Sequence, residues 1–359
     1  MHFVRCAYIG FAIQIGSLCL PSACDKASAQ IVAQTKNSVA VDALKADCAR
    51  IDSLVATAFV ERPHGSVTVG VVSGKELVWT KSYGNADMEK KAPADKDTIY
   101  RIGSITKMFT ALMLEQLTDT ATVHLSDPVE KYVPEINAVT DRYAGASPIT
   151  LIQLATHTSG LGREPADTKK YITGAVADWE KLLLLALRDT HYIAEPGTIY
   201  SYSNIGYATL GLALERALGK SYLAYVPAHI FTPLGMTHTS LDATPEMLPH
   251  LSKGYDVDGV PDASNSIREL KEGRGYKVPN GAIFTTVGDL AHFASFLMGE
   301  GPNDVLTAAS RKRYQRQYLV PSSSDLTSGY GIGFSSQGAI TTSPSATMAQ
   351  SMVTGRRSI

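Results

Sequence analysis

The feature that most constrains this chain is a predicted helix that is hydrophobic on nearly all of its faces. Residues 105–117 contain large apolar side chains at Ile105, Met108, Phe109, Leu112, Met113 and Leu114. Such a helix has no polar face to turn toward water, so it must lie inside a protein with other elements packed around it. The chain of 359 residues is long enough to enclose it, and more than one compact lobe is expected.

Two reactive side chains lie at the start of this helix, Ser104 and Lys107. Residues three apart share one helix face, so the Lys107 amine is expected to reach the Ser104 hydroxyl. A serine hydroxyl is a weak nucleophile that needs a base, and burial lowers the pKa of a lysine enough to make it one. Free N–H groups at a helix start also favour negative charge near Ser104. Because Ser-x-x-Lys is common by chance, a simple helix cap is the alternative.

A second motif, Tyr202-Ser203-Asn204, follows Glu195-Pro196-Gly197 and precedes another predicted helix. A tyrosine phenol near a serine and a lysine can pass a proton to a leaving group. The amide of Asn204 can hold a substrate carbonyl. A tyrosine that is merely packed in a turn would give the same short motif, so the two motifs have to be considered together.

Four ordered segments of the chain resemble the serine β-lactamase-related family, namely Thr98–Lys107, Ile149–Leu161, Pro196–Tyr207 and Asn280–Leu290. That family includes class C β-lactamases, D-alanyl-D-alanine carboxypeptidases, D-aminopeptidases and certain esterases. The resemblance extends from about Ala40 to Phe334. It implies an α/β (α+β) fold of the β-lactamase/transpeptidase type, with an antiparallel sheet flanked by helices and an inserted helical lobe. It also implies that Ser104 is acylated, Lys107 activates it, Tyr202 shuttles a proton and Asn204 contacts substrate.

Other hydrolase chemistries are less consistent with the sequence. His157 invites a triad with Ser104, but the resemblance implies a structural role for this histidine. The chain has no Gly-x-Ser-x-Gly elbow and no His-Glu-x-x-His motif, which argues against an α/β-hydrolase and a zinc peptidase. We expect no metal and no cofactor, and a small-molecule or peptidoglycan-derived substrate.

The third motif of the family, Lys-Thr-Gly or His-x-Gly on a strand beside the site, has no close counterpart. Val353-Thr354-Gly355 lies at a suitable distance, so Thr354 and Gly355 are the remaining substrate-binding candidates. Valine cannot hold a substrate carboxylate, and residues 335–359 lack strand alternation. We therefore expect the last strands and the closing helix of the family to be missing, through truncation or a shifted reading frame.

Two classes of function follow from these motifs. The leading interpretation is a hydrolase that forms an acyl-serine from a β-lactam, a D-alanyl peptide or a small ester. The alternative is a non-catalytic binding or sensor protein of the penicillin-recognising fold, or an inactive remnant. The net charge of −1 gives no indication of a nucleic-acid partner, and the sequence does not predict an oligomeric state.

The first 29 residues fit a signal peptide. Arg5 supplies a positive charge, residues 7–20 are apolar or small, and Ala27-Ser28-Ala29 matches a signal-peptidase site. Lipid attachment at Cys24 is the alternative, although the residues before it fit a lipoprotein box poorly. We expect a periplasmic or secreted protein without a stable membrane span. Only Cys48 would remain after cleavage, so no internal disulfide is expected.

Residues 30–359 are expected to form one domain, with a discontinuous α/β lobe at about 30–120 and 275–359 and a helical lobe at about 121–274. The periodicity predicts the following elements: helices at 39–60, 150–156, 177–187, 205–218 with Gly219 as C-cap, 222–231 and 286–298, strands at 66–72, 76–83 and 329–334, and a polar loop at 84–96. Thr286 and Asp289 are expected to form a capping box. Arg311-Lys312-Arg313 is interpreted as a solvated helix face.

Overall fold

The computed structural model describes residues 42, 44–256, 258–261, 270–318 and 328–337. The chain divides into two compact units, Met1–Glu61 and Arg62–Ile359. In the first unit, residues 44–61 form a helix that contains Cys48, in agreement with the predicted helix. The leader at 1–29, Cys24, and the candidates Thr354 and Gly355 lie outside the described residues.

The strands of the second unit pair in antiparallel fashion. Strands β1 (Ser66–Ser73) and β2 (Glu76–Asp87) form the predicted hairpin, and β3 (Ala92–Pro93) pairs with the end of β2. The expectation of a loop over residues 84–96 was therefore partly wrong. The polar residues there have low strand propensity, but pairing of Asn85 with Pro93 and Asp87 with Ala92 extends the ladder.

Two further small sheets join distant parts of the sequence. Strand β4 (Tyr100–Arg101) pairs with β5 (Phe284–Thr285), which places the segment before Ser104 beside the segment after Asn280. Strands β6 (Gln317–Tyr318), β7 (Ser328–Gly331) and β8 (Ser335–Gln337) form the third sheet. The single strand predicted at 329–334 is thus shorter, and residues 335–337, which lack strand alternation, form β8 by pairing with β7.

The hydrophobic helix lies in the core, as its composition predicts. It starts with a 3₁₀ turn, η1 (Gly103–Ile105), and continues as α2 (Thr106–Asp119). Phe109, Leu112, Met113 and Leu114 are fully buried. Phe109 stacks on Phe293 with ring centroids 4.4 Å apart and meets Phe231 edge-on at 5.6 Å.

Most of the other predicted helices are present. The predictions for 150–156, 177–187 and 205–218 are confirmed by α3 (Leu151–Ala155), α4 (Trp179–Leu187) and α5 (Asn204–Leu218), and Gly219 ends α5 at φ +67°. The helix predicted over 222–231 is split into α6 (Tyr222–Val226) and a π-helical turn, η6 (Pro227–Phe231). The change occurs at Pro227, which has no N–H to donate to the preceding turn.

Short elements complete the unit: α8 (Val278–Gly281), and the 3₁₀ turns η2 (Val129–Lys131), η3 (Pro134–Ala138), η4 (Thr168–Lys170), η5 (Val176–Asp178), η7 (Leu248–His250) and η8 (Gly275–Lys277). Both α5 and α8 pack against α2. In the part of the chain that the structure describes, none of the helices is long and apolar enough to cross a membrane.

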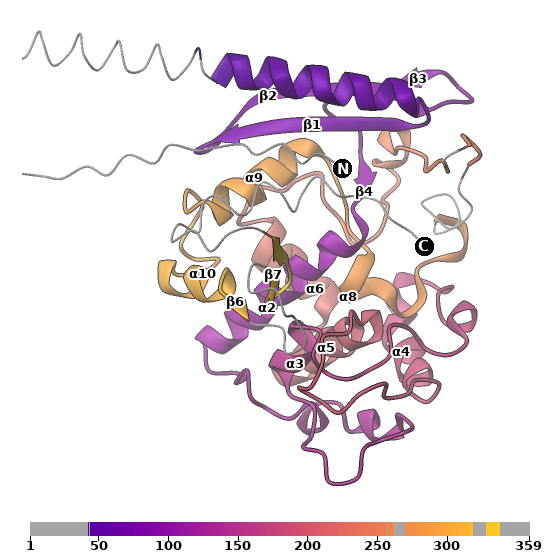
Figure 1. The fold of residues 1–359 in the computed structure, drawn as a ribbon, viewed down its shortest axis with the longest axis vertical. Coiled ribbons are helices and arrows are strands. Elements are labelled where there is room, and N and C mark those ends of the chain that lie inside the picture. Colours follow the sequence, from indigo (N-terminus) through magenta and orange to yellow (C-terminus); the bar gives the residue numbers. More distant parts are fainter. Residues whose placement is uncertain (1–41, 43, 257, 262–269, 319–327, 338–359) are drawn as a thin grey trace, which may run out of the picture. The chain divides into compact units, whose positions relative to one another are not determined.

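Helix α9 (Val287–Leu297) packs against β1 (Figure 1). Its start is capped by Thr286, whose Oγ1 accepts the Asp289 N–H at 3.2 Å. The predicted capping box is only half formed. The Asp289 carboxylate instead accepts the N–H of His238 at 2.7 Å and the hydroxyl of Thr239 at 2.6 Å, so it ties α9 to a neighbouring loop.

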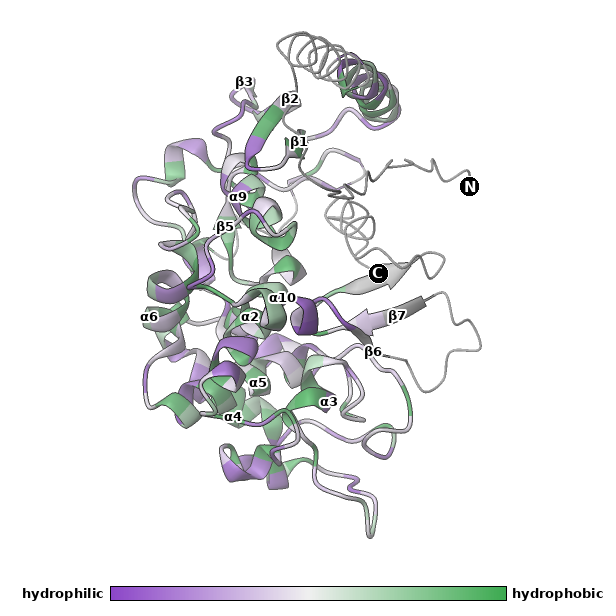
Figure 2. Cartoon of the chain, turned by 90° about the vertical axis from the view of Figure 1, so that its left-hand side faces the viewer, coloured by the Kyte–Doolittle hydropathy of each residue, from purple (hydrophilic) through white to green (hydrophobic). Residues whose placement is uncertain are grey.

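The basic run lies in α10 (Ala308–Tyr314), which is strongly hydrophilic in Figure 2. Its interpretation as a solvated face was wrong for two of the three residues. Arg311 is buried, and Arg313 binds Glu115 at 2.6 Å and Asp119 at 2.7 Å. These carboxylates lie on α2, so the acidic end of the core helix pairs with the basic face of α10.

The packing of η8 requires a glycine at position 275, and this can be tested. Gly275 has φ +58°, and a Cβ there would collide with the Tyr171 carbonyl oxygen, whereas Gly74 has a similar φ of +57° with open space around it. We expect Gly275→Ala to lower the free energy of unfolding by about 3 kcal/mol or more and Gly74→Ala by about 1 kcal/mol. Urea unfolding measures both, and equal losses would contradict the packing argument.

Candidate active site

Ser104 and Lys107 meet at the junction between β4 and α2. Gly103, at φ +53°, turns the chain into the helix immediately before Ser104. Ser104 is exposed, whereas Lys107, one turn later, is only 1% exposed. Lys107 Nζ lies 3.1 Å from Ser104 Oγ. The structure therefore brings together the hydroxyl and the amine that the sequence spacing places on one face.

Two oxygens besides Ser104 surround the Lys107 amine. Lys107 Nζ donates to Asn204 Oδ1 at 2.8 Å and to the main-chain oxygen of Asn280 at 3.0 Å. Both oxygens can only accept hydrogen bonds. A neutral amine has two N–H groups and one lone pair, so these two contacts leave the lone pair directed at Ser104 Oγ.

The surroundings of Lys107 also favour its neutral form. Complete burial holds the pKa of Lys107 well below its ordinary value of 10.5, because a charged ammonium loses its hydration there. Among the nearby charges, Glu164 acts against this shift, while Lys277, Arg163 and Arg274 lower the pKa further. The geometry and the burial therefore both suit Lys107 to accept a proton from Ser104.

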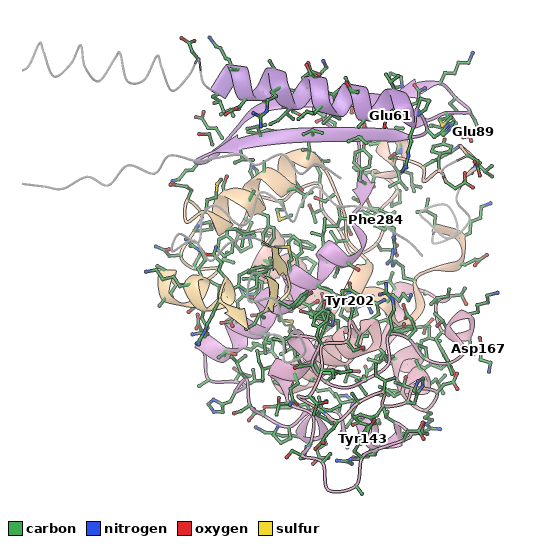
Figure 3. The ribbon with its side chains drawn as sticks, in the orientation of Figure 1. Glu61, Glu89, Tyr143, Asp167, Tyr202 and Phe284 are labelled. Atoms are coloured by element: carbon green, nitrogen blue, oxygen red, sulfur yellow. The ribbon has the colours of Figure 1, made fainter. Side chains whose placement is uncertain are left out.

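Tyr202 reaches the same hydroxyl from the other side. Its phenol donates to Ser104 Oγ at 2.8 Å, and Figure 3 shows Tyr202 in the middle of the second unit. Lys107 Nζ lies 4.8 Å from the Tyr202 ring centroid and the Arg163 guanidinium carbon 4.9 Å from it. Burial is the main cause that raises the pKa of Tyr202, so its phenol keeps its proton at neutral pH.

His157 holds the turn that presents Tyr202. Its carbonyl oxygen accepts the Ser201 N–H at 2.8 Å and its Nδ1 accepts the Ser203 N–H at 3.0 Å. The imidazole packs on the Tyr202 ring with centroids 4.3 Å apart. His157 therefore fixes both chain neighbours of Tyr202, and its hydrogen bonds are those of a structural residue rather than of a base in a triad with Ser104.

The protonation of His157 follows from its partners. Because a backbone N–H can only donate, Nδ1 must be the acceptor and the ring proton lies on Nε2, which is 3.2 Å from the Tyr330 hydroxyl. Complete burial is the main cause that holds the pKa of His157 well below 6.5, with the charges of Lys107 and Arg163 adding to it. The imidazole is thus neutral in the folded protein at neutral pH.

Glu164, Tyr276 and Lys277, which the sequence did not single out, complete the site. Asn204, the first residue of α5, donates from Nδ2 to Glu164 Oε1 at 2.7 Å. Lys277 Nζ lies 2.9 Å from the same oxygen, and the Tyr276 hydroxyl donates to Oε2. Glu164 comes three residues after the segment Ile149–Leu161, and Lys277 three residues before Asn280, so nearness to a motif was the only available signal.

The comparison with known protein families identifies the family of the chain. A sequence model of the family described as Beta-lactamase matches residues 51–345. The chain belongs to the β-lactamase family. The β-lactamase/transpeptidase-like fold that the motifs predict is thereby confirmed, and β-lactamase membership supports a serine-hydrolase type of function in general.

Similar proteins come from distant organisms. Beta-lactamase-like protein 2 of Dictyostelium discoideum is 32% identical over 260 residues, which cover 70% of this chain and 46% of that protein. The octameric penicillin-binding protein homologue from Pyrococcus abyssi is 25% identical with a TM-score of 0.65, over 81% of this chain and 65% of that one. A D-alanine carboxypeptidase from Burkholderia cenocepacia shares the β-lactamase fold at 22% identity and a TM-score of 0.63, over 80% and 73% of the two chains. The chain thus spans about half the length of the curated relative.

The buried neutral His157 predicts a pH dependence of stability. Its pKa is depressed in the folded state, so below about pH 6.5 the unfolded chain binds a proton that the folded chain does not. The free energy of unfolding should therefore fall as the pH drops from 7 to 5, by up to about 1.4 kcal/mol per pH unit from this group. His157→Asn, which tolerates the positive φ of 59°, should show a weaker pH dependence in urea unfolding.

The matched control is His124→Asn, because His124 is an exposed histidine. This variant should keep the pH dependence of the wild type. A His157→Asn variant with an unchanged dependence would contradict the assignment of a neutral buried imidazole.

Proposed function

We propose that this β-lactamase-family chain is an acyl-transfer hydrolase in which Ser104 is the nucleophile, Lys107 the base and Tyr202 the proton relay. The observation that supports this most directly is the buried Lys107 amine 3.1 Å from an exposed serine hydroxyl. Nucleophilic catalysis by serine needs a hydroxyl that substrate can reach and a base beside it, and burial favours the neutral, basic form of Lys107.

In the proposed acylation, Ser104 Oγ attacks the substrate carbonyl carbon and its proton moves to the Lys107 lone pair. The carbonyl oxygen becomes negatively charged, and the backbone N–H of Ser104, at the start of η1, is the donor that we assign to it. Asn204, beside the Lys107 amine, is proposed to contact the substrate.

Breakdown of the adduct then needs a proton on the leaving group. Tyr202 is the group that we assign to this step, because its phenol donates to Ser104 Oγ and keeps its proton at neutral pH. The Lys107 ammonium returns its proton through the phenol, and the bond from the carbonyl carbon to the leaving group breaks. Water completes the cycle by hydrolysing the acyl-Ser104 ester.

The substrates proposed are a β-lactam, a D-alanyl peptide or a small ester, since each presents a carbonyl with a leaving group to Ser104. The D-alanine carboxypeptidase among the structural matches shares the fold of this chain, and this shared fold is consistent with an acyl substrate of this kind. Thr354 and Gly355 stay predicted substrate contacts from the sequence.

Covalent labelling tests the nucleophile. The mature protein is incubated with a fluorescent penicillin and, separately, with a chromogenic ester, beside Ser104→Ala and the exposed-serine control Ser73→Ala. We expect a label or turnover in the wild type and in Ser73→Ala, and none in Ser104→Ala, with mass spectrometry placing the label on Ser104. Stoichiometric label without turnover would favour a sensor, and a folded protein without either signal would refute the proposal.

Removal of the Tyr202 hydroxyl tests the relay. Tyr202→Phe keeps the ring that packs on His157 and loses the hydrogen bond to Ser104. We expect the rate of acylation to fall by about 10²- to 10⁴-fold, the range of general acid–base catalysis, with the midpoint of urea unfolding little changed. A variant that acylates at the wild-type rate would exclude Tyr202 as the relay.

A further inference from the structure

The carboxylate of Glu164 is the centre of a hydrogen-bonded cluster behind the reactive residues. One oxygen accepts from Asn204 Nδ2 at 2.7 Å and from Lys277 Nζ at 2.9 Å, and the other accepts from the Tyr276 hydroxyl. Asn204 and Tyr276 are largely buried, and Lys277 is partly buried. Of the three groups that bind this carboxylate, Asn204 also contacts Lys107, and so it links Glu164 to the reactive amine.

The Asn204 side chain has two possible orientations, because its amide can be rotated to exchange oxygen and nitrogen. An ionised carboxylate only accepts hydrogen bonds, so the Asn204 NH₂ must face Glu164. The Asn204 oxygen must then face Lys107 Nζ, to which it lies at 2.8 Å. A reversed amide would place its oxygen against the carboxylate, which is repulsive, and its NH₂ against the Lys107 amine, where it would donate to the lone pair that Ser104 needs.

Resting on the proposed function, we propose that Glu164 is a positioning residue: it fixes the Asn204 oxygen on the Lys107 amine and so aims the Lys107 lone pair at Ser104. Of the two oxygens that hold the N–H groups of Lys107, the Asn280 carbonyl is fixed by the backbone of α8. Only the side-chain oxygen of Asn204 needs an external constraint, and Glu164 provides it from the loop between α3 and η4.

The loop and η8 are themselves placed by backbone contacts. The carbonyl of Arg163, beside Glu164, accepts the Asn204 N–H at 2.9 Å, so this loop is joined directly to the start of α5. The Tyr276 N–H donates to the Tyr171 carbonyl at 2.9 Å, and Gly275 allows that close approach. Glu164 is therefore held against Asn204 by the main chain as well as by its side chain.

The charge of Glu164 gives a readout that a purely structural role would not have. The charged groups that act on Lys107 are Glu164, which raises its pKa, and Lys277, Arg163 and Arg274, which lower it. The titratable groups around Lys107 that carry no charge are Tyr202, Tyr207 and His157. Glu164→Gln and Lys277→Met should therefore move the titration of Lys107 in opposite directions.

The first experiment compares the pH dependence of acylation. Glu164→Gln keeps an oxygen for Asn204 but loses the negative charge, so the rate should fall less than about 10-fold and its rise with pH should move to lower pH. Lys277→Met should move the rise to higher pH.

Glu164→Leu, which lacks the acceptor as well, should lower kcat by about 10²-fold with a smaller change in KM. Glu135→Gln is the control, because Glu135 pairs with Arg216 at 2.7 Å elsewhere in the unit.

The second experiment needs no substrate. The side-chain NH₂ of Asn204 and the ε-carbon of Lys107 are followed by NMR in the full chain, with assignments from Asn204→Asp and Lys107→Met. We expect opposite shifts of the Lys107 titration in Glu164→Gln and Lys277→Met, and fast hydrogen exchange at the Asn204 NH₂ only in Glu164→Leu.

The outcomes separate the two proposals. A wild type that neither labels nor turns over refutes the proposed function, while the NMR titration still decides the role of Glu164. An unchanged Lys107 titration in both variants, or a protected Asn204 amide in Glu164→Leu, would overturn the positioning role even if Ser104 is acylated.

Discussion

The rest of the site depends on one interaction, the burial of the Lys107 amine among three oxygens, two that accept from it and the Ser104 hydroxyl. An ammonium at 1% exposure would lose most of its hydration, so burial holds the pKa of Lys107 well below its ordinary value, and oxygens surround the amine. Asn204 lies 97 residues away from Lys107 and Asn280 lies 173 residues away. The fold must therefore bring α5 and α8 onto α2 before the amine has partners, and the packing of these three helices does so.

The sequence predicted the residues whose relation is local. Ser104 and Lys107 are one helical turn apart, so their contact follows from helix geometry once the hydrophobic helix is recognised. The apolar composition on nearly all faces predicted the burial of α2, and the periodicity together with Gly219 predicted the extent and the cap of α5. Tyr202 was found through its motif and the family resemblance. Its contact with Ser104 depends on the tertiary fold, which no local pattern contains.

The parts that the sequence could not give depend on tertiary partners. The Asn280 contact uses a main-chain oxygen, which every residue has, so no residue type marks it. Glu164 has the ordinary appearance of a loop carboxylate until α5 and η8 lie beside it. The same reason explains the errors in the fold: the short strands β3 and β8 exist because a partner strand pairs with them, and Arg313 is bound because Glu115 lies on a different helix.

The cluster behind Lys107 also explains how the nucleophile Ser104 can be exposed while the general base Lys107 is buried. Ser104 is exposed, whereas Lys107 is 1% exposed and lies within hydrogen-bond distance of Ser104, which Tyr202 also contacts. A substrate seated on Ser104 would cover this serine and leave the proton to move among the hydroxyl, the amine and the phenol. In such a dry arrangement each hydrogen bond is stronger and each unpaired group more costly, so the network works only when complete. The constraint on Asn204 by Glu164 therefore belongs to the chemistry of the site as much as to its architecture.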